Sequence, residues 1–163
     1  MIYLRHSHIL RSDDAFNAAN SAFADEDYDD ALEQFNLAID LGMKTADVHV
    51  KRAAAYIKLD KFPEALQDAN CAIGIDDKCA NAYMRKGVAC FELEEFETAK
   101  AAFCQGLEIS GAGTSAHKKF SSWVAKCEEK IDDDDDDDDD EDDDDDDDDD
   151  DQSSCWALTN HPA

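Results

Sequence analysis

The sequence predicts an all-α protein built from stacked helix pairs, closed by one further helix and followed by a disordered acidic tail. Three observations predict it. Residues 12–113 repeat with a period of 34 residues. An amphipathic segment follows the last repeat at about 115–131. Twenty consecutive carboxylates then run from residue 132 to residue 151 and account for most of the formal net charge of −27.

The 34-residue period is visible in three segments that align without gaps. The recurring positions are an aromatic residue at Tyr28, Phe62 and Phe96, and small residues at Ala19, Ala53 and Gly87, at Ala31, Ala65 and Ala99, and at Ala38, Ala72 and Gly106. A repeat of this length is a pair of antiparallel helices, which must stack because one pair cannot bury its own apolar face. The predicted repeats are about 12–45, 46–79 and 80–113.

The turns between the helices have their own signals. The acidic run DEDYDD (25–30) lacks the central Gly and the terminal Glu of a calcium loop, so we interpret it as the turn between the first two helices. Pro63 suits the first turn of the helix that follows Phe62. Residues 1–11 are expected to form a leader that is either poorly ordered or an extension of the first helix.

The segment after the third repeat has the pattern of a cap. Phe120, Val124, Cys127 and Ile131 recur at spacings of four, three and four residues, as on one face of a helix. A helix with one polar face is what the end of a stacked array requires. Residues 132–163 are expected to be disordered, because the acidic block repels itself and has nothing apolar to bury.

Composition limits the function classes. Strong acidity argues against nucleic acid and anionic membranes as partners, and no apolar run is long enough to span a bilayer. The six cysteines have no metal-binding spacing, and the N-terminus is a poor secretion signal, so we expect a reduced cytoplasmic and nuclear location. His49 and His117 are expected to stand alone. We therefore expect no metal, no cofactor and no catalytic site.

Three stretches resemble one family within the tetratricopeptide repeats: RAAAYIKLDKFPEALQDANCAI (52–73), AYMRKGVACFELEEFETAKAAF (82–103) and KCEEKI (126–131). They are similar to the tetratricopeptide-repeat domain of the plant co-chaperones named for suppression of the G-two allele of the Skp gene. The resemblance implies a co-chaperone adaptor that links heat-shock chaperones, ubiquitin-ligase components and immune receptors of plant disease resistance. Our first hypothesis is a scaffold that self-associates or docks ubiquitin-ligase components through the surface of the repeats. The chain is expected to be a truncated member, because the family's β-sandwich (CS) domain and C-terminal specific (SGS) region do not follow.

The repeat register also predicts a peptide-binding groove along the first helix of each pair. Its predicted residues are Phe16, Asn17, Asn20, Phe23, Val50, Lys51, Ala54, Ile57, Met84, Arg85, Val88 and Phe91. An apolar floor with two cations is typical of a site for a peptide. The alternative stays open: the apolar residues pack the array, and the two cations are solvated.

Many tetratricopeptide co-chaperones hold the C-terminal carboxylate of a chaperone with two Lys, two Asn and one Arg. The register places Phe16, Asn20, Lys51, Asn81 and Arg85 at these five positions. Only Asn20 and Arg85 match, and much of the charge-assisted hydrogen bonding is lost. We therefore expect weak binding, or none, of the acidic C-terminal peptide of the ninety-kilodalton heat-shock chaperone.

The acidic block gives a second hypothesis from a different class. The chain would be an acidic-tail chaperone or decoy for basic proteins, with the repeats as a carrier. Salt distinguishes the two hypotheses, because binding through the acidic block is screened at moderate ionic strength and binding in an apolar groove is not.

Overall fold

The structure, a computed structural model, describes the backbone of residues 2–134 and the side chains of residues 11–132. It contains seven helices: α1 (Ile2–Ala24), α2 (Tyr28–Asp40), α3 (Ala46–Lys58), α4 (Phe62–Ile75), α5 (Ala80–Glu92), α6 (Phe96–Ser110) and α7 (Ser115–Asp134). No strand occurs within this described part, so the predicted all-α class is confirmed. The tail predicted to be disordered lies, from residue 135 onward, outside the described residues.

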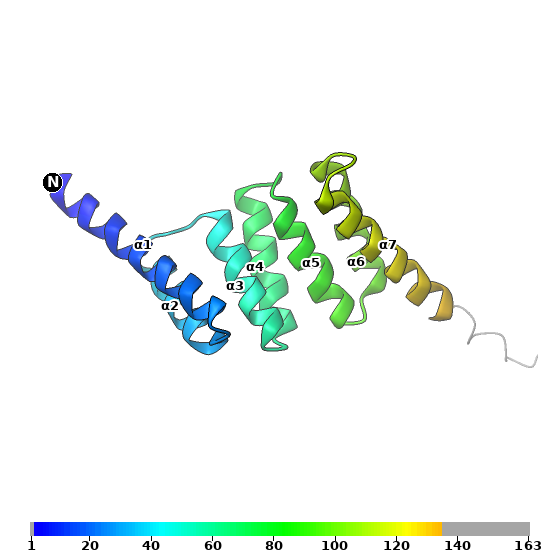
Figure 1. The fold of residues 1–163 in the computed structure, drawn as a ribbon, viewed down its shortest axis with the longest axis horizontal. Helices are drawn as coiled ribbons and strands as arrows, with labels where there is room; N and C mark the ends of the chain where they lie inside the picture. The colour runs from blue at the N-terminus through cyan, green and yellow to red at the C-terminus, as the bar shows by residue number, and fades with distance from the viewer. Residues whose placement is uncertain (1, 135–163) are drawn as a thin grey trace, which may run out of the picture.

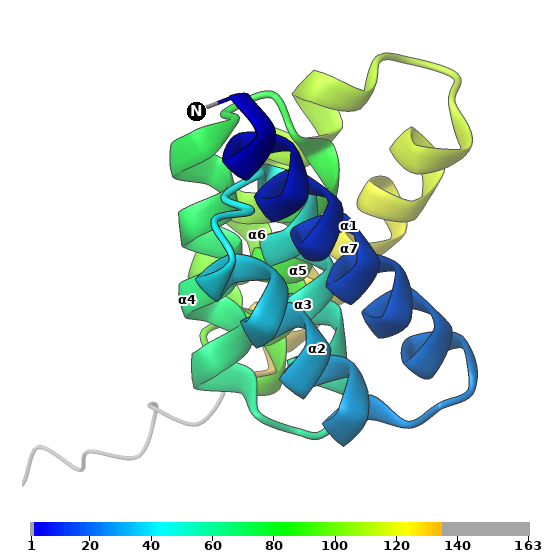
Figure 2. The ribbon, with the colours of Figure 1, turned by 90° about the vertical axis from the view of Figure 1, so that its left-hand side faces the viewer.

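The helices form an array that progresses along the long axis of the molecule (Figure 1). The pairs α1/α2, α3/α4 and α5/α6 follow one another, and α7 lies against α6 at the far end. Each helix packs against its neighbours in the chain, and α3 also contacts α5. Seen from the α1 end, the pairs stand one behind another (Figure 2). Helix α1 begins at Ile2, so the backbone of the predicted leader continues the first helix.

Small residues allow the helices of the array to pack closely, as the 34-residue register predicts. Ala19, Ala53 and Ala65 are fully buried, and a Cβ atom added to Gly87 would lie 2.4 Å from Cε1 of Phe103. An added Cβ on Gly106 would lie 2.3 Å from a ring carbon of Phe120 in the same way. The ring of a later helix therefore fills the space that each glycine leaves.

The turn inside each pair has the same backbone conformation. Glu26, Asp60 and Glu94, each 34 residues from the next, have φ values of 63°, 56° and 62°. Such left-handed values are uncommon for residues other than glycine, and they end the first helix of each pair. In the first pair, Asp27 then caps α2, because its Oδ1 accepts a hydrogen bond of 3.2 Å from the Asp30 N–H. Pro63 occupies the first turn of α4, as predicted.

Two aromatic clusters lie at the ends of the array, and alanine lies between them. Phe35 is fully buried in the N-terminal cluster, and Phe103 is fully buried in the C-terminal one. The middle of the array is packed by small buried residues: Val50, Ala72 and Ala82 in one cluster, and Ala53, Ala65 and Ala89 in another. Buried phenylalanine rings thus occur at both ends of the array, accompanied at the N-terminal end by several buried alanines.

Helix α7 covers the end of the array. Phe120 and Cys127 are buried against α6, and the Trp123 ring stacks on the Phe103 ring with centroids 5.3 Å apart. Lys126 lies on the outer side, with its Nζ atom 4.5 Å from the Trp123 ring centroid. The helix continues to Asp134, beyond the predicted end near residue 131. Within residues 2–134, no helix combines the length and the apolar character that a membrane span requires.

Removal of residues 135–163 is expected to leave the melting temperature of the array within a few degrees. The cap already covers Phe103, and the deleted segment carries most of a block of like charges whose mutual repulsion opposes compact structure. Thermal melts of residues 1–134 and of the full chain, followed by circular dichroism at low and moderate salt, test this expectation. A large loss of stability in the shorter chain would show that the tail supports the array.

Candidate peptide-binding groove

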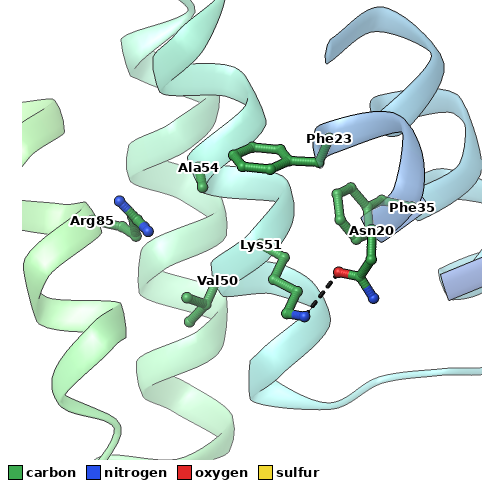
Figure 3. Close-up of a pocket in the computed structure, with 7 residues that line it drawn as sticks. All are labelled: Asn20, Phe23, Phe35, Val50, Lys51, Ala54 and Arg85. Atoms are coloured by element: carbon green, nitrogen blue, oxygen red, sulfur yellow. Dashed lines mark hydrogen bonds between the residues drawn. The ribbon is translucent and has the colours of Figure 1, made fainter. Parts of the chain in front are cut away.

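A hollow of about 230 Å³ lies between the inner helices in the N-terminal half of the array. It is lined by Asn20, Phe23, Phe35, Val50, Lys51, Ala54 and Arg85. These residues come from α1, α2, α3 and α5, and Figure 3 shows their side chains converging on α3. The hollow therefore forms only when the first three pairs of helices are stacked.

Lys51 stands at one side of the hollow. Its Nζ atom donates a hydrogen bond of 2.8 Å to Oδ1 of Asn20 (Figure 3) and lies 3.9 Å from a carboxylate oxygen of Asp47. The same atom is 4.8 Å from the centroid of the Phe16 ring, within the range of a cation–π contact. Lys51 is 40% exposed and already has three neighbours, so its charge is partly compensated.

Arg85 stands at the opposite side of the hollow, and its positive charge is much less compensated than that of Lys51. Its Nε atom is buried and has no hydrogen-bond partner within the described part of the chain. Burial removes water from the guanidinium and lowers the pKa of Arg85, although arginine remains charged at neutral pH. A buried donor without a partner is costly. The rest of the Arg85 side chain is half-buried and lines the hollow.

The remaining lining of the hollow is apolar. Val50 and Ala54 on α3 are buried, and the Phe23 ring points from α1 toward Ala54 (Figure 3). The Phe23 ring also meets the Tyr28 ring edge-on, with centroids 5.3 Å apart, which fixes its position. Phe35 on α2 also lines the hollow, and its ring centroid lies 6.0 Å from that of Phe16. A ligand in this hollow would therefore meet cations at the sides and carbon atoms in between.

Not all of the predicted groove residues line the hollow. Asn20, Phe23, Val50, Lys51, Ala54 and Arg85 do. Asn17 is exposed on α1, and Ile57 packs against the central alanine cluster. Met84, Val88 and Phe91 pack against the C-terminal cluster. The Phe91 ring meets the Trp123 ring edge-on with centroids 5.3 Å apart, so the packing interpretation holds best for this end of the groove.

Only some of the five positions predicted for a carboxylate clamp meet at the hollow. Asn20, Lys51 and Arg85 line the hollow, whereas Asn81 is exposed on α5 and does not. Phe16 stands beside Lys51 and offers a ring where the clamp has a cation. Sequence reasoning missed Phe35, which belongs to the second helix of its pair and so lies outside the register of the inner helices.

The strongest ionic contact of the described chain lies away from this groove, between α3 and α4. Asp68 is only 3% exposed and accepts two hydrogen bonds of 2.6 Å from Arg52. These bonds raise the pKa of Arg52, whose Nη1 also donates to Oδ1 of Asn36 at 2.7 Å. His49 Nδ1 lies 3.1 Å from Oδ1 of Asp68. The expectation that His49 stands alone was therefore wrong, because the helix-pair fold brings a residue 19 positions later beside it.

The described residues provide little for catalysis. Residues 11–132 contain no group of three or more His, Cys, Asp or Glu side chains that could hold a metal ion. Burial raises the pKa of Cys90 to about 11, so this thiol stays protonated at neutral pH and is a poor nucleophile.

Comparison with known proteins agrees with an array of stacked helix pairs. The tetratricopeptide repeat family model matches residues 80–112, the third helix pair. A rice (Oryza sativa subsp. japonica) protein, "Protein SGT1 homolog", is 39% identical over 118 residues, which cover 72% of this chain and 31% of the rice protein. The chain thus spans about a third of the length of that relative, whose name is that of the family the sequence resembles.

Two solved structures resemble the array closely. The tetratricopeptide domain of Sgt2 from Aspergillus fumigatus superposes with a TM-score of 0.69 at 28% identity, over 76% of this chain and 81% of that one. The second tetratricopeptide domain of human RPAP3, solved in complex with the HSP70 peptide SGPTIEEVD, gives a TM-score of 0.65 at 26% identity, over 76% of this chain and 97% of that one.

Proposed function

Because the chain is a tetratricopeptide-repeat domain of the kind found in co-chaperones, we propose that it is a non-enzymatic adaptor that binds an anionic peptide of a partner protein. The proposed site is the hollow between α1, α3 and α5, with Lys51 and Arg85 as its cations and Phe23 as part of its floor. The remaining predicted groove residues do not line this hollow: Phe16, Asn17, Ile57, Met84, Val88 and Phe91.

One observation carries the proposal: the buried Nε atom of Arg85 has no partner among the described residues. The Arg85 side chain is half-buried and lines the hollow, so a carboxylate bound there would form a charge-assisted hydrogen bond with its guanidinium. The human RPAP3 domain supports the same class of ligand, because its peptide SGPTIEEVD is acidic at its C-terminal end. The fold and the Arg85 side chain at the hollow thus favour the same class of ligand.

The partners follow from the resemblance to plant co-chaperones. We propose chaperone machinery and ubiquitin-ligase components as partners, with a role in plant immune-receptor pathways, in the cytoplasm and the nucleus. Self-association through the repeats belongs to the same proposal. Acidic chaperone peptides should bind more weakly than they do to a complete five-residue clamp, since Phe16 and Asn81 provide no cation.

Nuclear magnetic resonance titration tests the proposed site. The full chain, ¹⁵N-labelled, is titrated with SGPTIEEVD and with a control peptide in which both Glu are replaced by Lys. The acidic peptide is expected to shift signals of residues at the hollow, with a dissociation constant on the order of 0.1–1 mM. The basic peptide should leave those signals unchanged, because Lys51 and Arg85 repel it.

Arg85→Gln is expected to abolish these shifts, whereas Lys118→Gln, which removes an exposed cation from α7, should preserve them. The proposed site is wrong if the shifts map elsewhere, for instance to α7, or if Arg85→Gln leaves them unchanged. The acidic-tail hypothesis predicts the opposite selectivity: the basic peptide would shift signals of the acidic block, and the shifts would vanish at moderate salt.

A further inference from the structure

A second cavity lies where the turn between α5 and α6 meets the last turns of α7, and it shares no lining residue with the hollow between α1, α3 and α5. Its volume is about 490 Å³, within the roughly 300–1,000 Å³ of pockets that hold ligands. It is lined by Phe91, Glu92, Glu94, Phe96 and Lys130. We propose that this cavity holds an arginine side chain from a basic segment of a partner protein. The acidic block, which begins at residue 132, would attract the rest of that segment.

The carboxylates of the cavity have no cationic partner within the described part of the chain. Glu92 and Glu94 are both exposed, and the ion pairs among residues 11–132 involve other carboxylates. Lys130 is the single cation of the lining, and it pairs with neither of them. Two carboxylates against one cation leave a negative charge unbalanced, and a guanidinium that entered the cavity would form charge-assisted hydrogen bonds there.

The ends of two helices add negative potential at this place. Helix α5 ends at Glu92 and helix α7 ends at Asp134, and the two helices run in the same direction in the array (Figure 1). The C-terminal end of a helix favours a cation, yet neither helix has a basic residue in its last turn, and α7 ends in three aspartates. The opposite potential at the start of α6 is already matched by Glu97 in its first turn. A cation from a partner would therefore offset charges that the described chain leaves unbalanced.

The aromatic rings of the cavity select among cations. Phe91 meets Phe96 edge-on with centroids 5.3 Å apart, and it meets Trp123 edge-on at the same distance, so its ring is held in place. An arginine guanidinium is planar and weakly hydrated, so it can lie on a ring while its N–H groups reach a carboxylate. A lysine ammonium is a compact, strongly hydrated charge and loses more on entering such a site. The lining therefore favours arginine over lysine, whereas a run of aspartates attracts both through their equal charge.

Two peptides of equal charge test the proposal: GSRGSRGSRGSRG and GSKGSKGSKGSKG, each with a fluorescent label. At low salt both are expected to bind the full chain, because the acidic block attracts any basic segment. At physiological salt, where this attraction is screened, the arginine peptide should bind about five-fold or more tightly than the lysine peptide. Fluorescence anisotropy measures the affinities. Shifts in the ¹⁵N-labelled chain at Phe91, at Phe96 and at the indole of Trp123 locate the site.

Variants of the full chain tie this preference to the cavity. Glu92→Gln combined with Glu94→Gln should reduce the preference for arginine to less than about two-fold. Glu33→Gln combined with Glu64→Gln removes the same charge from exposed positions on α2 and α4, and it should leave the preference unchanged. Lys130→Gln removes the cation of the lining and should strengthen binding of the arginine peptide about two-fold or more. All of the replaced side chains are exposed, so each variant is expected to fold.

Three results would overturn the inference. The first is equal affinity of the two peptides at physiological salt. The second is a preference for arginine that survives the loss of both Glu92 and Glu94. The third is a set of shifts confined to the acidic block from residue 132, which would mean contact with the block only. The proposed groove function is tested with SGPTIEEVD at other residues, so it stands or fails separately.

Discussion

Replacing Asp68 by alanine is expected to lower the free energy of unfolding by about 3–5 kcal/mol, because it breaks a buried ion pair from one side. Asp68 holds Arg52 through two hydrogen bonds of 2.6 Å and lies 3.1 Å from His49. Without the carboxylate, the Arg52 side chain, which is only 18% exposed, loses its main partner. Such a loss is a large part of the roughly 5–15 kcal/mol that stabilises a typical domain.

Urea denaturation followed by circular dichroism measures this change, with Asp47→Ala as the control. Asp47 is 60% exposed and lies 3.9 Å from Lys51, so its removal should change stability by no more than about 0.5 kcal/mol. The double variant Asp68→Leu with Arg52→Met should recover much of the loss, because both buried charges are removed together. Equal effects of Asp68→Ala and Asp47→Ala would contradict a stabilising role of this pair.

Gly87→Ala is expected to destabilise the array by about 1–3 kcal/mol, since the added methyl group has no space. Its carbon atom would lie 2.4 Å from the Phe103 ring, which is fully buried and packed against Trp123. Gly74 on α4 is the matched control, because no atom lies within 4 Å of the position of its added Cβ. Gly74→Ala should stabilise the protein by about 0.5–1 kcal/mol, through the higher helix propensity of alanine.

The two glycine variants make the same chemical change in a helix, so opposite signs isolate the packing contact. Thermal melts of both variants against the parent chain are sufficient to determine the signs. If Gly87→Ala were as stable as Gly74→Ala, the added methyl group would not meet the Phe103 ring. This result would contradict the close approach of α5 and α6 at Gly87.

The sequence was sufficient to predict the architecture because the 34-residue period constrains every helix pair at once. Ala19, Ala53 and Gly87 could be aligned without knowing any contact, and all three are buried where the helices meet. The end of the cap was less predictable. The apolar pattern stops at Ile131, whereas helix α7 continues to Asp134, because backbone hydrogen bonds extend a helix beyond its last packed side chain.

The candidate site was only partly predictable. The register places Lys51 and Arg85 on the inner helices. It does not show that Lys51 donates a hydrogen bond to Asn20, or that the Nε atom of Arg85 is buried without a partner among the described residues. Those differences depend on side-chain directions across separate helices. The contact between His49 and Asp68 was missed for the same reason, since the two residues belong to different helices and occupy different repeat positions.

The packing of each helix against its neighbours in the chain has a consequence for how the protein folds. Most stabilising contacts join residues that are close in sequence, so the relative contact order is low and few long loops must close before a contact forms. Proteins of this kind fold within microseconds to milliseconds. A ribosome adds roughly 5–20 residues per second, so each helix pair has time to dock on its neighbour while the rest of the chain is still being synthesised.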